Sequence, residues 1–289
     1  MPRIRRTKAE VARLDGVICA IVARDHPLTV RNCFYQVVSQ PEPLVEKSQR
    51  GYVAVQRRLV ELRRSGRIPY GCIVDASRAG HFVSSFDSPE EALRETAAFY
   101  RRNIWKHNPT HVEVWCESRS IAGSIVGETR EAGVPLYPCG GFPSDSLIYE
   151  AGQHLAQIVG PERKAAIIYI GDYDASGVLI GAGLEEKLRE HAPNVEIAFN
   201  RIAVTPDQIS LMGLPHKPVK DRRGGFDGAG TVEAEAIPAP EMRRILAQEI
   251  EAFIDSDVFG AVRAAEESER HLLHLFAERA AEIAYEDGN

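Results

Sequence analysis

The chain has 289 residues, of which 44% are hydrophobic and 26% charged, a composition typical of globular proteins and a length that allows two domains. No apolar run is long enough to cross a bilayer, and the first residues lack the apolar stretch of a secretory signal. We therefore expect a cytoplasmic protein with no membrane partner. The five cysteines form no CxxC pair, which argues against a zinc knuckle or a disulfide framework.

Charge is distributed unevenly along the chain. Of 35 basic and 41 acidic residues, residues 1–72 hold 14 and 6, a net charge of +8, and the remaining 21 and 35 give −14. The asymmetry favours a module that binds a polyanion joined to an acidic module. A solvated basic helix face would give the same count, so charge alone does not establish a DNA partner.

Three helices are predicted in the basic part. Thr7 and Glu10 form a capping box that starts a helix over 7–24, and Thr29 can cap a second helix with one buried stripe. The third helix spans about 46–65 and turns five arginines mostly outward as candidate DNA contacts: Arg50, Arg57, Arg58, Arg63 and Arg64.

A strand-like segment at 72–74 follows the third helix. Three helices, the third of them basic, with a strand turn after them describe a winged helix-turn-helix whose third helix lies in the DNA major groove. A helical bundle in an interaction module fits the same periodicity. A further helix is predicted over 88–106, and we place the domain boundary after it, giving a DNA-binding domain at 1–107 and a second domain at 108–289.

The second domain alternates strands and helices. This βα repeat predicts an α/β fold with a mainly parallel sheet covered on both faces. Residues 205–230 are expected to form loops, and helices return from about 240 to 285. Strands are predicted at 111–116, 134–138, 165–170 and 195–202, and helices at 120–132, 145–159 and 177–190.

Two of these strands run into acidic residues. One strand leads to Glu117, and another leads to Asp172 and Asp174, which alternate so that both can point the same way. Active groups gather beyond the carboxyl ends of parallel strands, and oxygen ligands alone favour Mg²⁺ or Mn²⁺. For a single acid, capping the next helix is the more common role. The combination of all three favours a metal site.

The residues also resemble a known family. HVEVWCESRSIAG, GGFPSDS and IIYIGDYDASG resemble the Toprim domain, which has a glutamate after one strand and a DxD motif after a later one. Arg31 to Tyr35 (RNCFY) is similar to the catalytic-tyrosine motif of topoisomerase VI A subunits, the meiotic double-strand-break protein and their short Mini-A relatives. The stretch TVEAEA at 231–236 looks similar to a later family segment. Ala175 and Ser176 replace the Pro-aromatic pair common in the A subunits.

The resemblance implies a mechanism. Tyr35 would attack a DNA phosphodiester while Mg²⁺ on Glu117, Asp172 and Asp174 stabilises the departing oxygen, with Tyr35 of one subunit of a homodimer facing the acids of the other. Helix geometry turns Tyr35 away from the buried stripe and puts Arg31, at i−4, beside it, where it could bind the phosphate. The chain has no ATPase motif, so strand passage would need a separate ATPase subunit or would not occur at all.

Two other functions remain open: a Toprim nuclease that hydrolyses DNA with metal-activated water, and a DNA-binding scaffold without catalysis. Glu233 and Glu235 alternate in a strand-like run; a supporting metal role is open to them, although surface acids are the default. The GGFPSD turn could offer N–H groups to a phosphate. A basic segment offers either DNA contacts or a mobile loop: Lys217, Lys220, Arg222 and Arg223.

Overall fold

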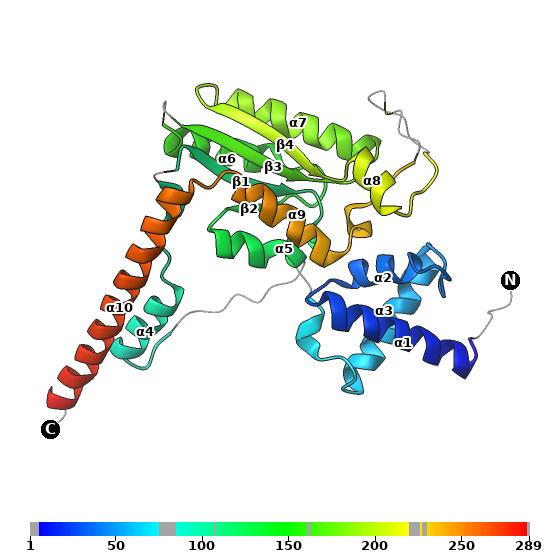
Figure 1. The fold of residues 1–289 in the computed structure, drawn as a ribbon, viewed down its shortest axis with the longest axis horizontal. Coiled ribbons are helices and arrows are strands. Elements are labelled where there is room, and N and C mark those ends of the chain that lie inside the picture. Colours follow the sequence, from blue (N-terminus) through cyan, green and yellow to red (C-terminus); the bar gives the residue numbers. More distant parts are fainter. Residues whose placement is uncertain are drawn as a thin grey trace.

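The protein is described here from a computed structural model, which describes residues 6–74, 85–106, 108–160, 163–219, 226 and 230–287. Helices α1–α3 form one group, and a sheet flanked by helices forms another (Figure 1). The long helix α10 runs away from the sheet on the side opposite α1–α3, with α4 beside it. None of the described helices combines the length and the low charge that crossing a bilayer requires.

The three N-terminal helices form as predicted. They are α1 (Lys8–Asp25), α2 (Val30–Val38) and α3 (Gln49–Arg64). Thr7 and Glu10 make the predicted capping box, and the Thr29 side chain caps α2 by accepting from the Asn32 N–H. The helices pack through fully or almost fully buried apolar side chains: Leu14, Ile18, Cys33, Val37, Val55, Leu59 and Leu62.

The prediction of a strand at 72–74 is wrong. A short 3-10 turn, η1 (Tyr70–Cys72), occupies its start, and Ile73 forms only an isolated bridge with Leu28. The pairing cannot continue because the chain enters α2 two residues after Leu28. No β-hairpin follows within the described part of the N-terminal region, so the winged form of the helix-turn-helix stays a prediction.

The predicted parallel α/β sheet is confirmed. Its order is β2-β1-β3-β4, and every neighbouring pair is parallel. The inner strands β1 and β3 are buried along almost their whole length, as expected for strands covered on both faces. The strand bounds are β1 (Thr110–Cys116), β2 (Leu136–Pro138), β3 (Lys164–Ile170) and β4 (Glu196–Ala203).

Two helices cover each face of the sheet. Side chains of α6 (Asp145–Ile158) and α7 (Ala175–His191) form one core with Trp115, Ile167 and Tyr169. On the other face, α5 (Arg119–Ala132) and α9 (Ala239–Glu251) pack on residues of β1 and β3 that point the opposite way. Successive side chains of each strand point to opposite faces of the sheet, so each strand contributes to two separate cores.

The remaining helices depart from the predicted lengths. The helix predicted over 88–106 ends early: α4 is Pro89–Phe99, because Tyr100 leaves helical geometry, and η2 (Ile104–Lys106) follows separately. The expected loop at 205–230 contains a short helix, α8 (Pro206–Met212). Residues 234–236 form the 3-10 turn η4 (Ala234–Ala236), and α10 spans Ser256–Asp287.

Packing connects the two predicted domains. One hydrophobic cluster includes the core of α1–α3 and the α5/α9 face of the sheet. Helix α2 contacts η4 and α5, and the Thr29 and Ser120 hydroxyls are 2.6 Å apart. Helix α4 packs on α10, and Tyr100 donates to Glu269 of that helix. The boundary at 107/108 stays a prediction, but α4 lies with the C-terminal helix and not with α1–α3.

Candidate functional site

Two of the predicted acids meet at the carboxyl ends of β1 and β3. These strands are neighbours in the sheet, and the backbone N–H of Glu117 donates to the carbonyl of Ile170 at 2.8 Å. The backbone N–H of Asp172 donates in return to Glu117 Oε2 at 3.1 Å. The parallel register therefore brings together two carboxylates that are separated by 55 positions in the chain.

Asp174 has a different local role. It is the N-cap of α7, and its carboxylate accepts from the Gly177 N–H at 2.7 Å. Glu117 does not cap α5, because Ser118 does. The common capping role thus applies to one of the three acids. Across the described residues, no group of three or more His, Cys, Asp or Glu side chains is arranged to hold a metal ion.

A third carboxylate lies beside Glu117 and Asp172. Glu235 is only 1% exposed, so the default expectation of a surface acid is wrong for it. It accepts from the Ser118 hydroxyl at 2.7 Å, and the neighbouring Ala234 N–H donates to Asp172 Oδ1 at 2.8 Å. A pocket of about 400 Å³ is lined by these residues: Arg31, Glu117, Ser118, Arg119, Ser120, Gly140, Gly141, Asp172 and Glu235.

Ionising the carboxylates of this acidic pocket is unfavourable. Burial, together with the charges of Glu235 and Glu117, raises the pKa of Asp172 to about 8. Burial also raises the pKa of Glu117, and the nearby Asp174 charge adds to the effect. Carboxylates that disfavour one another's ionised form are stabilised when a divalent cation binds. The oxygen-only donor set fits Mg²⁺ or Mn²⁺, and Mg²⁺ commonly uses one or two carboxylates plus substrate phosphate.

Tyr35 lies in an adjoining pocket of about 280 Å³, the tyrosine pocket. The prediction that it faces away from the core is wrong, since Tyr35 is 3% exposed. Helix α2 is short and contacts α1, α3, α5 and η4, so residues outside the predicted stripe are covered as well. The pocket is lined by Arg31, Phe34, Tyr35, Lys47, Ser48, Gln49, Tyr52, Lys217 and Glu233.

The Tyr35 hydroxyl faces the carboxylate of Glu233. Burial, followed by the interaction with this carboxylate and its charge, raises the pKa of the phenol well above its usual value. The ammonium of Lys47 lies 5.0 Å from the centre of the Tyr35 ring. In this arrangement the phenol is neutral at physiological pH.

Arg31 connects the two pockets, because it lines both of them. Its guanidinium contacts Glu233 at 2.6 Å on one side and Glu235 at 3.4 Å on the other. Arg31 and Tyr35 share the tyrosine pocket, as their i, i+4 spacing predicts. The side chain is therefore held between the phenol and the acidic pocket of the same chain.

The predicted basic face of α3 is only partly available to DNA. Arg50, Arg57 and Arg64 are exposed. Arg58 makes two hydrogen bonds, of 2.7 and 2.8 Å, to the buried carboxylate of Asp15, and Arg63 lies over the ring of Tyr70 and donates to its carbonyl. Two of the five arginines therefore have partners inside the protein.

The structure describes some of the other residues that the sequence suggested as phosphate or DNA contacts. The N–H groups of Gly140 and Gly141 both donate to the Glu117 carbonyl, which corrects the idea that this turn offers them to a phosphate. Lys217 lines the tyrosine pocket. Lys220, Arg222 and Arg223 lie outside the described residues.

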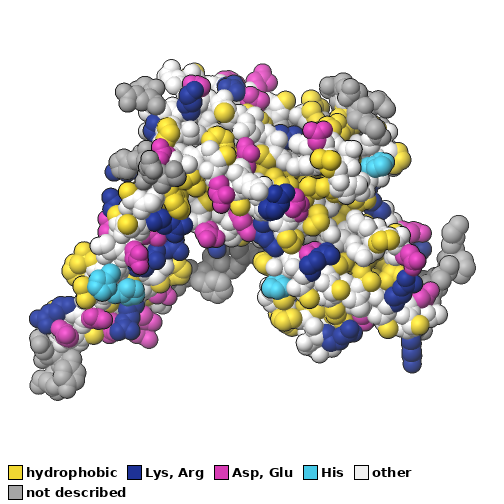
Figure 2. Space-filling model, in the orientation of Figure 1, with side chains coloured by type: hydrophobic (Ala, Val, Ile, Leu, Met, Phe, Trp, Pro, Cys, Tyr) yellow, Lys and Arg dark blue, Asp and Glu magenta, His cyan; other side chains and the backbone are white. Residues whose placement is uncertain are grey.

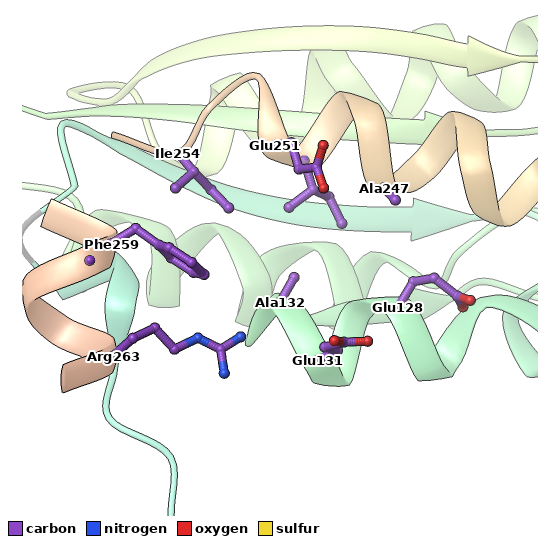
Figure 3. Close-up of a pocket in the computed structure, with 10 residues that line it drawn as sticks. Glu128, Glu131, Ala132, Ala247, Glu251, Ile254, Phe259 and Arg263 are labelled. Atoms are coloured by element: carbon purple, nitrogen blue, oxygen red, sulfur yellow. The ribbon is translucent and has the colours of Figure 1, made fainter. Parts of the chain in front are cut away.

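A further cavity, of about 530 Å³, lies between α5, α9 and α10 (Figure 3). Phe259 and Ile254 provide part of its apolar wall, and acidic side chains from α5 and α9, including Glu128 and Glu251, stand around it. Acidic side chains also gather over α5 and α9 on this face of the molecule (Figure 2). The cavity shares no lining residue with the tyrosine or acidic pockets.

Comparisons of this chain with protein-family models, with curated proteins and with solved structures gave no match.

Proposed function

We propose that this protein is a DNA transesterase of the type IIB topoisomerase kind, which makes Mg²⁺-dependent double-strand breaks through a phosphotyrosyl intermediate. The observation that carries the proposal is the position of Arg31, which lines both the pocket of Tyr35 and the pocket of Glu117 and Asp172. A phosphodiester bound at the guanidinium would lie between a nucleophile and a carboxylate pair. The resemblance of both motifs to the topoisomerase VI A family supports the same activity, although the resemblance implies that Tyr35 acts with the acids of a partner subunit.

The reaction follows from the chemistry of these groups. The phenolic oxygen of Tyr35 loses its proton to solvent and attacks phosphorus while the bond from phosphorus to the 3′ oxygen breaks. The 3′ oxygen takes up a proton from solvent, so a 5′-phosphotyrosyl link and a free 3′ hydroxyl result. Arg31 neutralises the charge that develops on the phosphoryl oxygens. Glu117 and Asp172, with Asp174 beside them, would hold Mg²⁺ or Mn²⁺, and such an ion would supply a Lewis acid that stabilises negatively charged oxygen. The reverse attack reseals the strand.

Cleavage of both DNA strands requires two tyrosines and therefore a homodimer. The exposed arginines Arg50, Arg57 and Arg64 supply non-specific contacts to the phosphate backbone of double-stranded DNA. A separate ATPase subunit would be needed for strand passage, because cleavage and rejoining by transesterification conserve bond energy and do not by themselves drive directed movement.

The test is a cleavage assay on supercoiled plasmid with Mg²⁺ or Mn²⁺, stopped with denaturant and divided into samples with and without protease. Wild-type protein should give ends that enter the gel only after proteolysis. Tyr35→Phe should form no covalent adduct while retaining DNA binding. Asp172→Asn should lose cleavage as well. Adduct formation by Tyr35→Phe would overturn the proposal.

The burial of Tyr35 favours a second candidate, a nuclease in which metal-activated water attacks the phosphodiester and Tyr35 only positions it. That enzyme would cleave DNA in the Tyr35→Phe variant and lose activity in Asp172→Asn. DNA binding without cleavage by the wild-type protein, under any metal condition, would instead indicate a scaffold.

A further inference from the structure

The carboxylate of Glu233 is surrounded by groups that ordinarily bind phosphate. Arg31 donates to its Oε2 at 2.6 Å, and Lys217 donates to its Oε1 at 2.5 Å. The Tyr35 hydroxyl also faces this carboxylate. Although burial alone would raise its pKa, these three polar neighbours lower the pKa of Glu233 to about 2, so the group is an anion at any physiological pH.

The tyrosine pocket holds more positive charge than Glu233 can balance. Its lining contains three cations, from Arg31, Lys47 and Lys217, and one carboxylate. Burial and the charge of Lys217 together lower the pKa of Lys47, which shows that the two ammonium groups affect each other. The first residues of α3 also line the pocket and add the partial positive charge of a helix N-terminus. A second anionic oxygen group would be attracted here.

The backbone on both sides of Glu233 is held in place. Val232 exchanges two hydrogen bonds with Tyr173, at 2.8 and 3.0 Å, and the Ala234 N–H donates to Asp172. The Glu233 side chain is 20% exposed, so it reaches the pocket mouth. Rotation of this side chain alone would release the three donors without moving the segment that also positions Asp172.

We infer that Glu233 occupies, in the free protein, the position at which a DNA phosphate binds, and that Arg31, Lys47, Lys217 and the Tyr35 hydroxyl form the phosphate-binding site. This inference rests on the proposed function, since it assigns the substrate group to the same pocket. It makes Lys47 and Lys217 positioning residues for the phosphate.

The test measures binding of inorganic phosphate, by isothermal titration calorimetry in metal-free and DNA-free buffer. Glu233→Gln keeps the side-chain shape and removes the competing charge, so it should bind phosphate about tenfold more tightly than the wild type or better. Glu42→Gln is the matched control, because it also removes one acid paired with an arginine, at an exposed site that does not line the tyrosine pocket. Adding Lys217→Ala to Glu233→Gln should abolish the gain.

A stability measurement covers the case in which the loss of the Glu233 charge unfolds the Glu233→Gln protein. Inorganic phosphate should then raise its thermal midpoint by several degrees more than it raises those of the wild type and Glu42→Gln. Equal phosphate affinities and equal thermal shifts in all three proteins would overturn the inference, as would a gain that survives Lys217→Ala.

The binding test is independent of cleavage. If Glu233→Gln binds phosphate more tightly but the wild type forms no covalent DNA adduct, the phosphate site stands and the transesterase proposal fails. If the wild type forms the adduct but Glu233→Gln gains no affinity, the transesterase proposal stands and Glu233 is only a structural ion-pair partner.

Discussion

At position 177 the side chain can be no larger than a hydrogen atom. A Cβ atom at Gly177 would lie 2.2 Å from the carbonyl oxygen of Asp172 and 3.1 Å from Glu117 Oε2. Gly183 lies in the same helix, and a Cβ atom added there would have no atom within 4 Å. The glycine after the DxD motif thus allows the first turn of α7 to approach both strand ends closely.

We expect Gly177→Ala to lower the free energy of unfolding by about 1–3 kcal/mol, because backbone atoms must move to admit the methyl group. DNA cleavage should fall further than stability explains, since Asp172 and Glu117 would be displaced. Gly183→Ala is the control and should stabilise the helix by about 0.5–1 kcal/mol. Urea unfolding of both variants tests this; equal effects would contradict the argument.

The lowered pKa of Glu233 predicts how the stability of the protein depends on pH. Its pKa is lowered to about 2 in the folded protein from the usual 4.5, so its contribution is present above about pH 4.5 and is lost as pH falls towards 2. The shift corresponds to roughly 3 kcal/mol. The difference in unfolding free energy between wild type and Glu233→Gln should therefore shrink between pH 5 and pH 3. A difference that stays constant over this range would show that the folded carboxylate has an ordinary pKa.

At the scale of a secondary-structure element, helix α3 has two kinds of arginine. Arg57 is exposed, whereas Arg58 is bound by the carboxylate of Asp15, which is 5% exposed. Removing Arg58 would leave a buried carboxylate whose remaining basic neighbour, among the residues that the structure describes, is Arg67 at 3.6 Å. Charge on a helix face therefore does not by itself identify a DNA contact.

These adjacent residues should respond in opposite ways. Arg58→Ala should lower the free energy of unfolding by about 1–3 kcal/mol, the cost of an unsatisfied buried charge partner. Arg57→Ala should leave stability within about 0.5 kcal/mol of wild type and weaken binding of duplex DNA, with a salt dependence reduced by about one counterion. Urea unfolding and fluorescence anisotropy at several salt concentrations separate the two. A loss of stability in Arg57→Ala would contradict the assignment.

At the scale of the whole molecule, the continuous core between α1–α3 and the sheet determines how the protein unfolds. Ile18 of α1 and Val112 of β1 belong to the same hydrophobic cluster. Polar contacts between α2 and the segment 233–235 cross the same junction. Shared burial of this kind couples the stability of the two parts.

The two tryptophans, Trp105 and Trp115, both lie outside α1–α3 and report on the second part. Ile18→Ala should lower the free energy of unfolding by about 2–5 kcal/mol, because it leaves a cavity beside α1. It should therefore also lower the unfolding midpoint that tryptophan fluorescence records. Val178→Ala, at an exposed position of α7, should leave the midpoint almost unchanged. If Ile18→Ala leaves the tryptophan transition unmoved, the two parts unfold independently.

Much of the fold could be predicted from local patterns. The capping box at Thr7, the cap at Thr29 and the alternation of strands and helices from β1 to β4 depend on residues close together in the chain. The strand predicted at 72–74 failed because its partner, Leu28, is distant in sequence and is followed at once by a helix. The early end of α4 was likewise set by contacts of Tyr100 with α10.

The sequence by itself determined which residues we propose for the chemistry: Tyr35, Arg31 and the acids that follow β1 and β3. Only the tertiary structure decided their surroundings. It buried Tyr35, turned Asp174 to cap its helix and brought Glu233 and Glu235 against Arg31 across about 200 positions of chain. Side-chain type and spacing report helix faces and strand ends, because those depend on near neighbours. Burial and ionisation depend on which distant segments pack together, and no local pattern contains that information.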